Sequence, residues 1–158
     1  MRLSSFSVEN YRSITTARKV PLSQYSLLVG ANNEGKSNIL HALALGMDVL
    51  ANWTSSTRRM PDGTVLRKPR FDYYRSSARY DWEIDFPVGK QKSSEKDKTT
   101  KITLEFILDD KEQQQFSNDI KSRLNGSLPI QITFAANGEA SLLVQKPGRG
   151  QASLTKKS

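Results

Sequence analysis

Eight residues constrain this chain more than any other segment. Residues 30–37 read Gly-Ala-Asn-Asn-Glu-Gly-Lys-Ser and match G-x-x-x-x-G-K-[ST], the pattern of the phosphate-binding P-loop. The pattern has this meaning only between a buried strand and a helix. Both are predicted here, because residues 25–29 form a short apolar run typical of a buried strand and a helix begins near Gly35. The predicted apolar face of that helix contains Ile39, Leu40, Leu43, Met47 and Leu50.

Each position of this loop has a chemical reason. Gly30 allows a sharp turn off the strand, and Gly35 lets backbone N–H groups approach a phosphate without an intervening side chain. The N–H groups from about Asn33 to Ser37 then point into an anion site at the start of the helix, where the helix dipole favours negative charge. Lys36 is expected to reach the β- and γ-phosphates, and the Ser37 hydroxyl is expected to bind Mg²⁺.

The rest of the chain alternates between strand and helix patterns. Asp109 is a predicted helix N-cap, with Glu112 as its capping-box partner, and this helix is expected to run to about Leu124. The dipeptide Asn137-Gly138 indicates a hairpin turn. Two further segments are predicted to be a long basic loop, 56–79, and a charged tip, 89–100. The predicted strands are 2–11, 15–20, 80–86, 101–108, 129–135 and 140–145.

Composition excludes several classes of site. The 158 residues contain no cysteine, so disulfides, cysteine zinc sites and thiol nucleophiles are excluded. The only histidine, His41, is expected to be structural. No apolar run is long enough for a membrane helix and the start lacks a signal-peptide core, so a cytoplasmic protein without a membrane partner is expected.

The net charge of +8 is concentrated in a few segments, and residues 58–79 alone carry +5. Aromatic residues alternate with the arginines of this stretch, as suits contact with nucleic acid backbones and bases. The alternative is a loop that packs its aromatic side chains on the sheet and leaves its arginines in solvent. Both interpretations stay open from the sequence. The aromatic residues concerned are Phe71, Tyr73, Tyr74 and Tyr80.

Residues 1–50 carry a resemblance to a known family. The segment Glu9-Asn10-Tyr11-Arg12-Ser13-Ile14 is followed by a second strand and then by a stretch of the form L-L-V-G-x-N-N-x-G-K-S-N-[IL]-L-x-A-L. This arrangement resembles the head domains of the RecF/SMC branch of ABC-type ATPases. Within that branch, the wording NNEGKSNIL and the element order after it are most similar to the OLD-family ATPases. Over residues 80–145 the similarity is one of pattern only.

The resemblance implies a fold and a division of the chain. The fold class is α/β: a P-loop NTPase, the N-terminal lobe of an ABC-type ATPase head with a mixed or antiparallel β subdomain. Residues 1–145 would form this part of the ATPase domain, with the P-loop at 30–37, the basic loop at 56–79 and a β-α-β portion at 80–145. Residues 146–158 are expected to be a disordered tail. The chain would then be the N-terminal part of a larger ATPase.

The resemblance also implies a site and partners. Arg12 and Ser13 would lie beside the nucleotide. ATP and Mg²⁺ are the implied cofactors, with Ser37 on the metal. ATP hydrolysis would be coupled to DNA binding or cleavage, in phage defence or DNA repair, and the partners would be DNA and either a second head in a head-to-head dimer or a nuclease. The residues implied to line the phosphates are Asn32, Asn33, Gly35, Lys36, Ser37 and Asn38.

The sequence leaves the catalytic residues unassigned. The run from Ile102 to Asp110 mimics a Walker B strand, but Glu105 interrupts its apolar pattern and Asp109 fits an N-cap better. No signature segment or nuclease acidic cluster is recognisable. Two alternatives therefore stay open: a truncated head that binds a nucleotide or a partner without turnover, and a free-standing P-loop kinase.

Overall fold

A five-stranded antiparallel sheet forms the body of the computed structural model, with strand order β2-β1-β5-β6-β7. The strands are β1 Arg2–Tyr11, β2 Ile14–Pro21, β5 Thr100–Ile107, β6 Ser127–Phe134 and β7 Ala140–Val144. A separate two-stranded sheet pairs β3 Thr57–Arg59 with β4 Val65–Arg67, so this part of the predicted basic loop 56–79 is a strand pair instead. The structure describes residues 1–30, 35–53, 57–59, 65–67, 80–94, 97–120 and 126–144.

Alternation of apolar and polar residues determines which face of each strand is buried. In β5, Ile102 and Leu104 are completely buried, and the residues that alternate with them along the strand point to the other face. The strand β1 pairs with β5 from Arg2 opposite Ile107 to Glu9 opposite Lys101. The start of β1 therefore lies beside the end of β5. All the strands of this sheet were predicted, within one to two residues at most ends.

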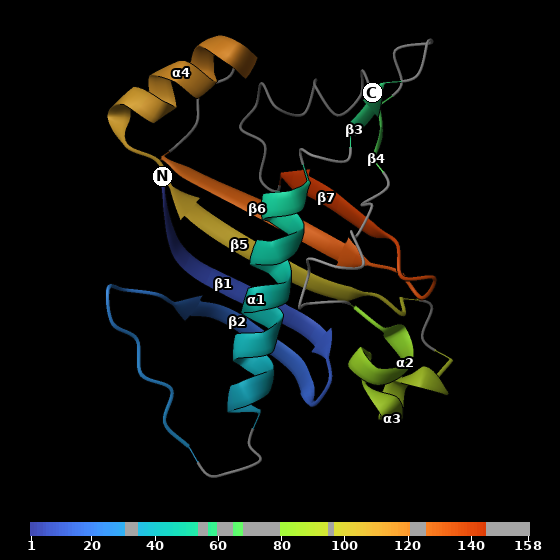
Figure 1. The fold of residues 1–158 in the computed structure, drawn as a ribbon. Coiled ribbons are helices and arrows are strands. Elements are labelled where there is room, and N and C mark those ends of the chain that lie inside the picture. The colour runs from blue at the N-terminus through green and yellow to red at the C-terminus, as the bar shows by residue number, and fades with distance from the viewer. Residues whose placement is uncertain are drawn as a thin grey trace.

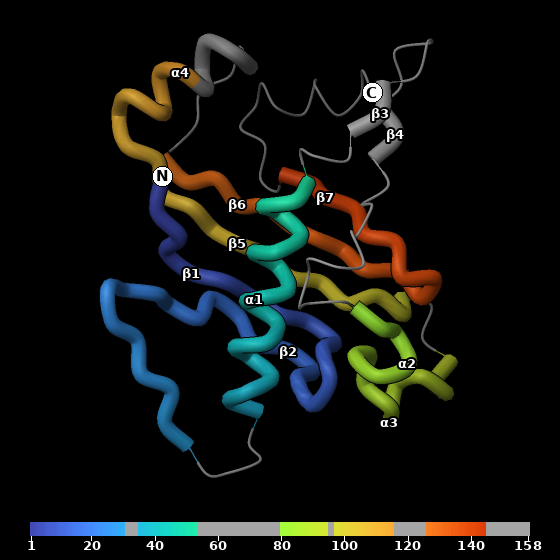
Figure 2. The backbone as a smooth tube through the Cα atoms, in the orientation of Figure 1, coloured from blue at the N-terminus to red at the C-terminus, as the bar shows by residue number. Residues whose placement is uncertain are grey.

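The helix α1, Lys36–Asn52, crosses the buried face of this sheet (Figures 1 and 2). Its contacting residues are Ala42, Leu45, Gly46 and Val49. The predicted contact face is confirmed in part, because Ile39, Leu43 and Leu50 are partly buried and pack against the core. Leu40 and Met47 do not belong to it, since they are 54% and 39% exposed. Small residues face the sheet because they let the backbone of α1 approach the strands closely. A Cβ atom at Gly46 would lie 2.9 Å from Ile102 Cγ2.

The segment 80–86 is not a strand, contrary to the sequence prediction. It contains a short helix, α2 Trp82–Asp85, and is followed by a second one, α3 Val88–Gln91. The carboxylate of Asp81 caps α2 by accepting from Glu83 N at 3.0 Å. Trp82 and Phe86, four residues apart, stack with ring centroids 5.3 Å apart. These local contacts outweigh the two-residue alternation, and α3 replaces the start of the predicted charged tip.

The apolar run 25–29 is also not a buried strand. It is an extended segment in which Tyr25, Leu27 and Val29 are each more than 80% exposed. The chain bends just before it, where Ser23 N donates to Ser26 Oγ at 3.1 Å. No strand of the described sheet pairs with this segment. Of the two elements that should flank the P-loop motif, the structure therefore contains the helix after it but not the buried strand before it.

The helix α4, Asp110–Ile120, confirms the predicted capping box. Glu112 N donates to Asp109 Oδ1 at 2.9 Å, and Asp109 N donates to Glu112 Oε2 at 3.0 Å. The expected end of the helix near Leu124 lies outside the described residues, as does the predicted tail. The α/β fold class predicted from the sequence is confirmed, with the P-loop helix laid on an antiparallel sheet.

Candidate functional site

The P-loop motif ends at the N-terminus of α1. Gly35 is the N-cap residue, with φ of 83° and ψ of 1°, and Lys36 is the first helical residue. This left-handed conformation favours glycine, as the motif requires. Lys36 Nζ donates to Gly30 O at 2.5 Å, so its side chain joins the two ends of the loop. Residues 31–34 lie outside the described residues, so the roles given to Asn32 and Asn33 remain predictions.

The turn between β1 and β2 packs against this helix start. Ser13 Oγ accepts a hydrogen bond from Asn38 Nδ2 at 2.9 Å. A Cβ atom at Gly35 would lie only 3.2 Å from the same Ser13 hydroxyl. The structure therefore brings together Ser13, Gly35 and Asn38, although 25 residues separate Ser13 from Asn38.

Arg12, which precedes Ser13 in this turn, makes three polar contacts with other residues. Its Nε donates to Asp85 Oδ1 at 2.8 Å, and its backbone N donates to Asp85 O at 2.6 Å. Its Nη1 lies 2.9 Å from His41 Nδ1, which must be the acceptor because a guanidinium has only donors. Arg12 itself has φ of 49°, a left-handed conformation that is uncommon for a residue with a side chain.

Asp85 and His41 contact Arg12, and sequence reasoning named neither of them as a candidate site residue. Asp85 was placed on the polar face of a strand that does not exist, and only 2% of the residue is exposed. His41 was expected to be structural, but it is exposed and accepts from Arg12 across the edge of α1. The only signal in the sequence was their residue type, because Asp85 lies 73 residues and His41 lies 29 residues from Arg12.

Charge and burial shift the titration of the residues around Asp85. The hydrogen bond to Asp85 raises the pKa of Arg12, which keeps the guanidinium charged. Burial, together with the nearby Asp85 carboxylate, raises the pKa of Tyr11 to about 12. Burial also raises the pKa of Tyr80 to about 12, while its hydrogen bond with Thr100 opposes the shift. At neutral pH this end of the sheet thus holds a charged arginine and two neutral phenols.

The pair Asp109-Asp110 lies at the other end of the sheet. The strand β5 leads to it and ends opposite Arg2, whereas Arg12 follows the far end of β1. Ten strand residues separate these ends by roughly 30 Å. Glu112 of the same helix pairs with the terminal ammonium of Met1, also at that end. The rejection of a Walker B role for these carboxylates is therefore consistent with their placement far from Lys36.

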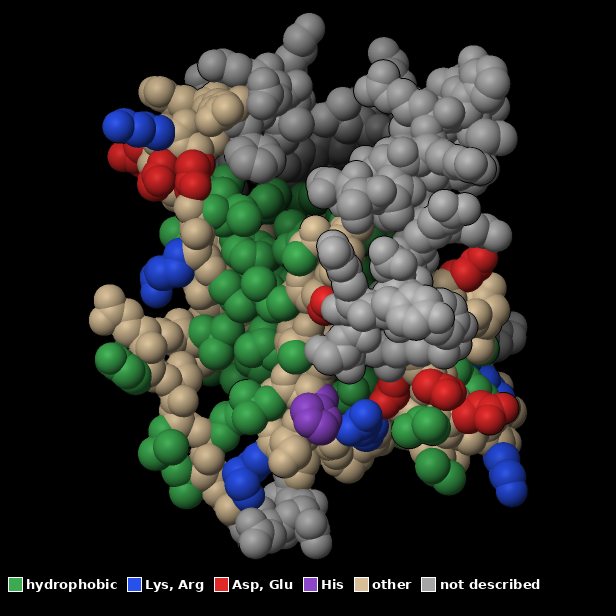
Figure 3. All heavy atoms as spheres, in the orientation of Figure 1, with side chains coloured by type: hydrophobic (Ala, Val, Ile, Leu, Met, Phe, Trp, Pro, Cys, Tyr) green, Lys and Arg blue, Asp and Glu red, His purple; other side chains and the backbone are tan. Residues whose placement is uncertain are grey.

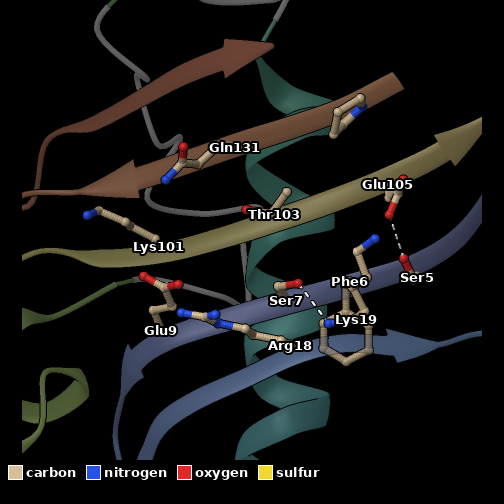
Figure 4. Close-up of a pocket in the computed structure, with 11 residues that line it drawn as sticks. Ser5, Phe6, Ser7, Glu9, Arg18, Lys19, Lys101, Thr103, Glu105 and Gln131 are labelled. Carbon is tan, nitrogen blue, oxygen red and sulfur yellow. Dashed lines mark hydrogen bonds between the residues drawn. The ribbon is translucent and has the colours of Figure 1, made fainter. Parts of the chain in front are cut away.

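A hollow of about 380 Å³ lies on the sheet face turned away from α1 (Figure 4). Its charges have both signs, and Glu105 is already held by Ser5 Oγ at 3.0 Å and Ser127 Oγ at 2.8 Å. Mixed charge that is satisfied internally is typical of the solvated face of an antiparallel sheet. The lining residues include Ser7, Glu9, Arg18, Lys19, Lys101, Thr103 and Gln131.

Apolar side chains gather on the opposite face, over which α1 runs (Figure 3). Separately, five exposed apolar residues lie near the P-loop in sequence: Tyr25, Leu27, Val29, Leu40 and Met47. Within the described residues there is no helix long and apolar enough to cross a membrane. No cluster of three or more carboxylate or histidine side chains that could hold a metal occurs in that same part of the chain. Most of the basic segment 58–79 lies outside the described residues.

Comparison with known proteins identifies the family. Residues 1–145 match the family described as "AAA ATPase domain", and the chain therefore belongs to that family. No curated protein has a sequence that matches this chain. One solved structure, reported as "Structural biochemistry of ATP-driven dimerization and DNA stimulated activation of SMC ATPases", is similar at 16% identity. That similarity covers 93% of this chain and 71% of the other, with a TM-score of 0.49.

Proposed function

We propose that this member of the AAA ATPase domain family binds ATP at the N-terminus of α1. The observation that carries the proposal is the junction of Gly35 and Lys36, where a left-handed glycine opens a helix whose first residue is the motif lysine. Backbone N–H groups that have no intrahelical partner, together with the helix dipole, make the start of a helix favourable for phosphate. The family match gives the phosphate a source, because the family is one of ATPases.

The residues at this junction divide the work by chemistry. Lys36 would leave the Gly30 carbonyl and donate to the β- and γ-phosphates as a point charge. The exposed Ser37 hydroxyl in the first turn of α1 would be a ligand of Mg²⁺. One hydroxyl suffices because Mg²⁺ keeps several waters and shares the phosphate oxygens, so the donor set fits this ion. Mg²⁺ would neutralise charge on the phosphates.

The finer function follows the resemblance in residues 1–50. The chain would be the ATP-binding part of a RecF/SMC-like, OLD-type ATPase, divided as predicted from the sequence, whose ATP binding and hydrolysis control DNA binding or cleavage in phage defence or DNA repair. The packing of the Arg12-Ser13 turn against Asn38 and Gly35 supports this proposal. DNA, a second head or a nuclease would be the partners. The net +5 on residues 58–79 supports an anionic polymer as one of them.

Calorimetric titration with Mg·ATP tests the site. Lys36→Ala should weaken binding by about tenfold or more, because one charge-assisted hydrogen bond is worth about 1.5–3 kcal/mol. Lys111→Ala is the matched control, since Lys111 is an exposed lysine of α4 at the opposite end of the sheet. Equal affinities of wild type and Lys36→Ala would contradict the proposal.

A second candidate is a nucleotide-binding chain without turnover. It is favoured by the position of Asp109, which caps α4 roughly 30 Å from the P-loop end and so cannot activate water there. Phosphate release, measured with and without DNA, separates the two candidates. This second candidate predicts that the 158-residue chain releases phosphate no faster than its Lys36→Ala variant. Turnover that depends on Lys36 would favour the enzyme.

A further inference from the structure

Asp85 is a buried carboxylate to which the proposed ATP site gives no role. The residue closes the short helix α2 and is only 2% exposed. A carboxylate withdrawn from water is tolerated when its oxygens are paired. Both are paired here: Oδ1 accepts from Arg12 Nε at 2.8 Å, and Oδ2 accepts from Asp81 N at 2.9 Å.

The same residue also fixes the backbone of Arg12. The hydrogen bond from Arg12 N to Asp85 O measures 2.6 Å, and Arg12 has the strained φ of 49°. Strained backbone persists where the surroundings over-determine it, and such residues concentrate at functional sites. Asp85 therefore holds Arg12 at two points: its backbone N–H and Nε, the first nitrogen of its guanidinium.

The P-loop helix holds the guanidinium from a second side. Nη1 donates to His41 Nδ1 on α1, while Nη2 makes no hydrogen bond to any residue that the structure describes. The neighbouring residue, Ser13, contacts Asn38 and the Gly35 position directly. Among the described residues, Nη2 is thus the guanidinium nitrogen that remains as a donor, at the end of the sheet where the P-loop meets α1.

We propose that Asp85 is a positioning residue for Arg12, and that it presents the remaining guanidinium N–H groups to the phosphates of ATP. The inference rests on the proposed function. An arginine side chain has many rotamers, and binding a phosphate normally costs the entropy of ordering it. The contacts with Asp85 and His41 order the side chain before the ligand arrives. The Asp85 charge also keeps the guanidinium in place through a charge-assisted hydrogen bond.

A purely structural role for Asp85 makes a different prediction. In that case Asp85 would only anchor α2 to the sheet, and its loss would lower stability and weaken ATP binding whether or not Arg12 is present. A positioning role requires that the effect on ATP affinity disappear when Arg12 is absent. Two changes that act through one side chain are not additive.

A double-mutant cycle on the 158-residue chain measures this dependence, with Mg·ATP as the titrant. Arg12→Ala should weaken affinity by about tenfold or more, the value of one charge-assisted hydrogen bond. Asp85→Asn should weaken it by about three- to tenfold in the wild-type background and by less than about twofold in the Arg12→Ala background. Asp81→Asn is the matched control, because it removes the same charge from the same segment and asparagine is an equally good N-cap.

The outcomes distinguish failure of the Asp85 positioning role from failure of the proposed ATP site. An Asp85→Asn effect of equal size in both backgrounds, or no effect while Arg12→Ala weakens binding, overturns the positioning role and leaves the ATP site standing. Unchanged affinity in Lys36→Ala overturns the ATP site and the inference with it. Where circular dichroism shows that Asp85→Asn is unfolded, Asp85→Glu takes its place in the cycle. It keeps the charge but displaces it, and should give the same dependence on Arg12.

Discussion

Gly35 is the residue at which the P-loop becomes a helix, and two independent features restrict it. Its φ of 83° lies in the left-handed region, where other residues are strained by about 1–2 kcal/mol. A Cβ atom would also lie 3.2 Å from Ser13 Oγ, which is closer than most real Cβ contacts. The motif glycine is therefore required both by the loop and by the packing of the β1–β2 turn.

Replacing this glycine should be costly. Gly35→Ala is expected to lower the free energy of unfolding by about 1–2 kcal/mol and to weaken Mg·ATP binding, because the loop must shift to relieve the strain. Denaturant unfolding and calorimetry measure the two effects. Gly89→Ala is the control, since a Cβ there meets nothing within 4 Å and should change stability by less than about 0.5 kcal/mol. Equal stabilities for the two variants would show that the left-handed conformation is not required.

Tyr11 predicts a dependence of stability on alkaline pH. Its pKa is raised from 10.0 to about 12 in the folded protein, so the phenol stays protonated while the unfolded chain begins to ionise near pH 10. The stability linked to this shift is complete below pH 10 and is lost as pH rises from about 10 to about 12. The loss should amount to roughly 2–3 kcal/mol. Unfolding free energies across this range should fall less steeply for Tyr11→Phe, and an unchanged slope would contradict the shift.

At the scale of elements, the sequence predicted what local patterns determine. Alternation in β1 and β5 and the Asp109–Glu112 capping box carry their own structure, and these predictions are confirmed. The segment 80–86 shows where this fails, because Trp82 and Phe86 fit both a two-residue and a four-residue spacing. Only the cap at Asp81 and the partners of Asp85 decide between them, and the main partner, Arg12, is distant in sequence.

The candidate site divides in the same way. The motif located the start of α1, and the pattern around Arg12 and Ser13 placed that turn beside it, as the contact between Ser13 and Asn38 shows. Asp85 and His41 could not be predicted, since they join the site through tertiary contacts alone. The binding roles of the motif residues remain predictions.

The contact of α1 with β5 yields a test at this scale. Gly46→Ala should destabilise the protein by about 1 kcal/mol, because overpacking against Ile102 costs about 1–3 kcal/mol and the gain in helix propensity returns only about 1 kcal/mol. Ala44→Leu, on the exposed side of the same helix, should stay within about 0.5 kcal/mol of wild type. Stabilisation by Gly46→Ala in denaturant unfolding would contradict the close packing of α1 on the sheet.

At the scale of the whole molecule, the two ends of the sheet carry different groups of residues. One end carries α4 and its capping box, and the other joins Gly35, Ser13 and Arg12 to the short helices α2 and α3 (Figure 1). The exposed apolar side chains near the P-loop, of which Tyr25, Leu27 and Val29 are the most exposed, lie outside the core. Exposed apolar surface of this kind marks an interaction site or a tendency to associate.

DNA binding is proposed for the whole molecule, and reversing charges can test it. Reversing Arg58, Arg59, Arg70 and Arg75 should weaken duplex binding and flatten its salt dependence, since each lost phosphate contact reduces the slope by about 0.9. Fluorescence anisotropy at several salt concentrations measures both. The control reverses four cations outside this segment: Arg2, Lys92, Lys96 and Lys111. An unchanged slope in the first variant, or an equal change in both, would exclude the segment as the DNA surface.

The central claim is that ATP binds where Gly35 opens α1, and a crystal structure with Mg²⁺ and a non-hydrolysable ATP analogue tests it most directly. The measurement is the distance from Lys36 Nζ to the nearest phosphate oxygen. We predict a hydrogen bond of about 2.7–2.9 Å between these two atoms. Lys36 should be released from the Gly30 carbonyl, and Ser37 Oγ should bind the metal. A nucleotide bound elsewhere, or Lys36 still on the Gly30 carbonyl beside a bound nucleotide, would contradict it.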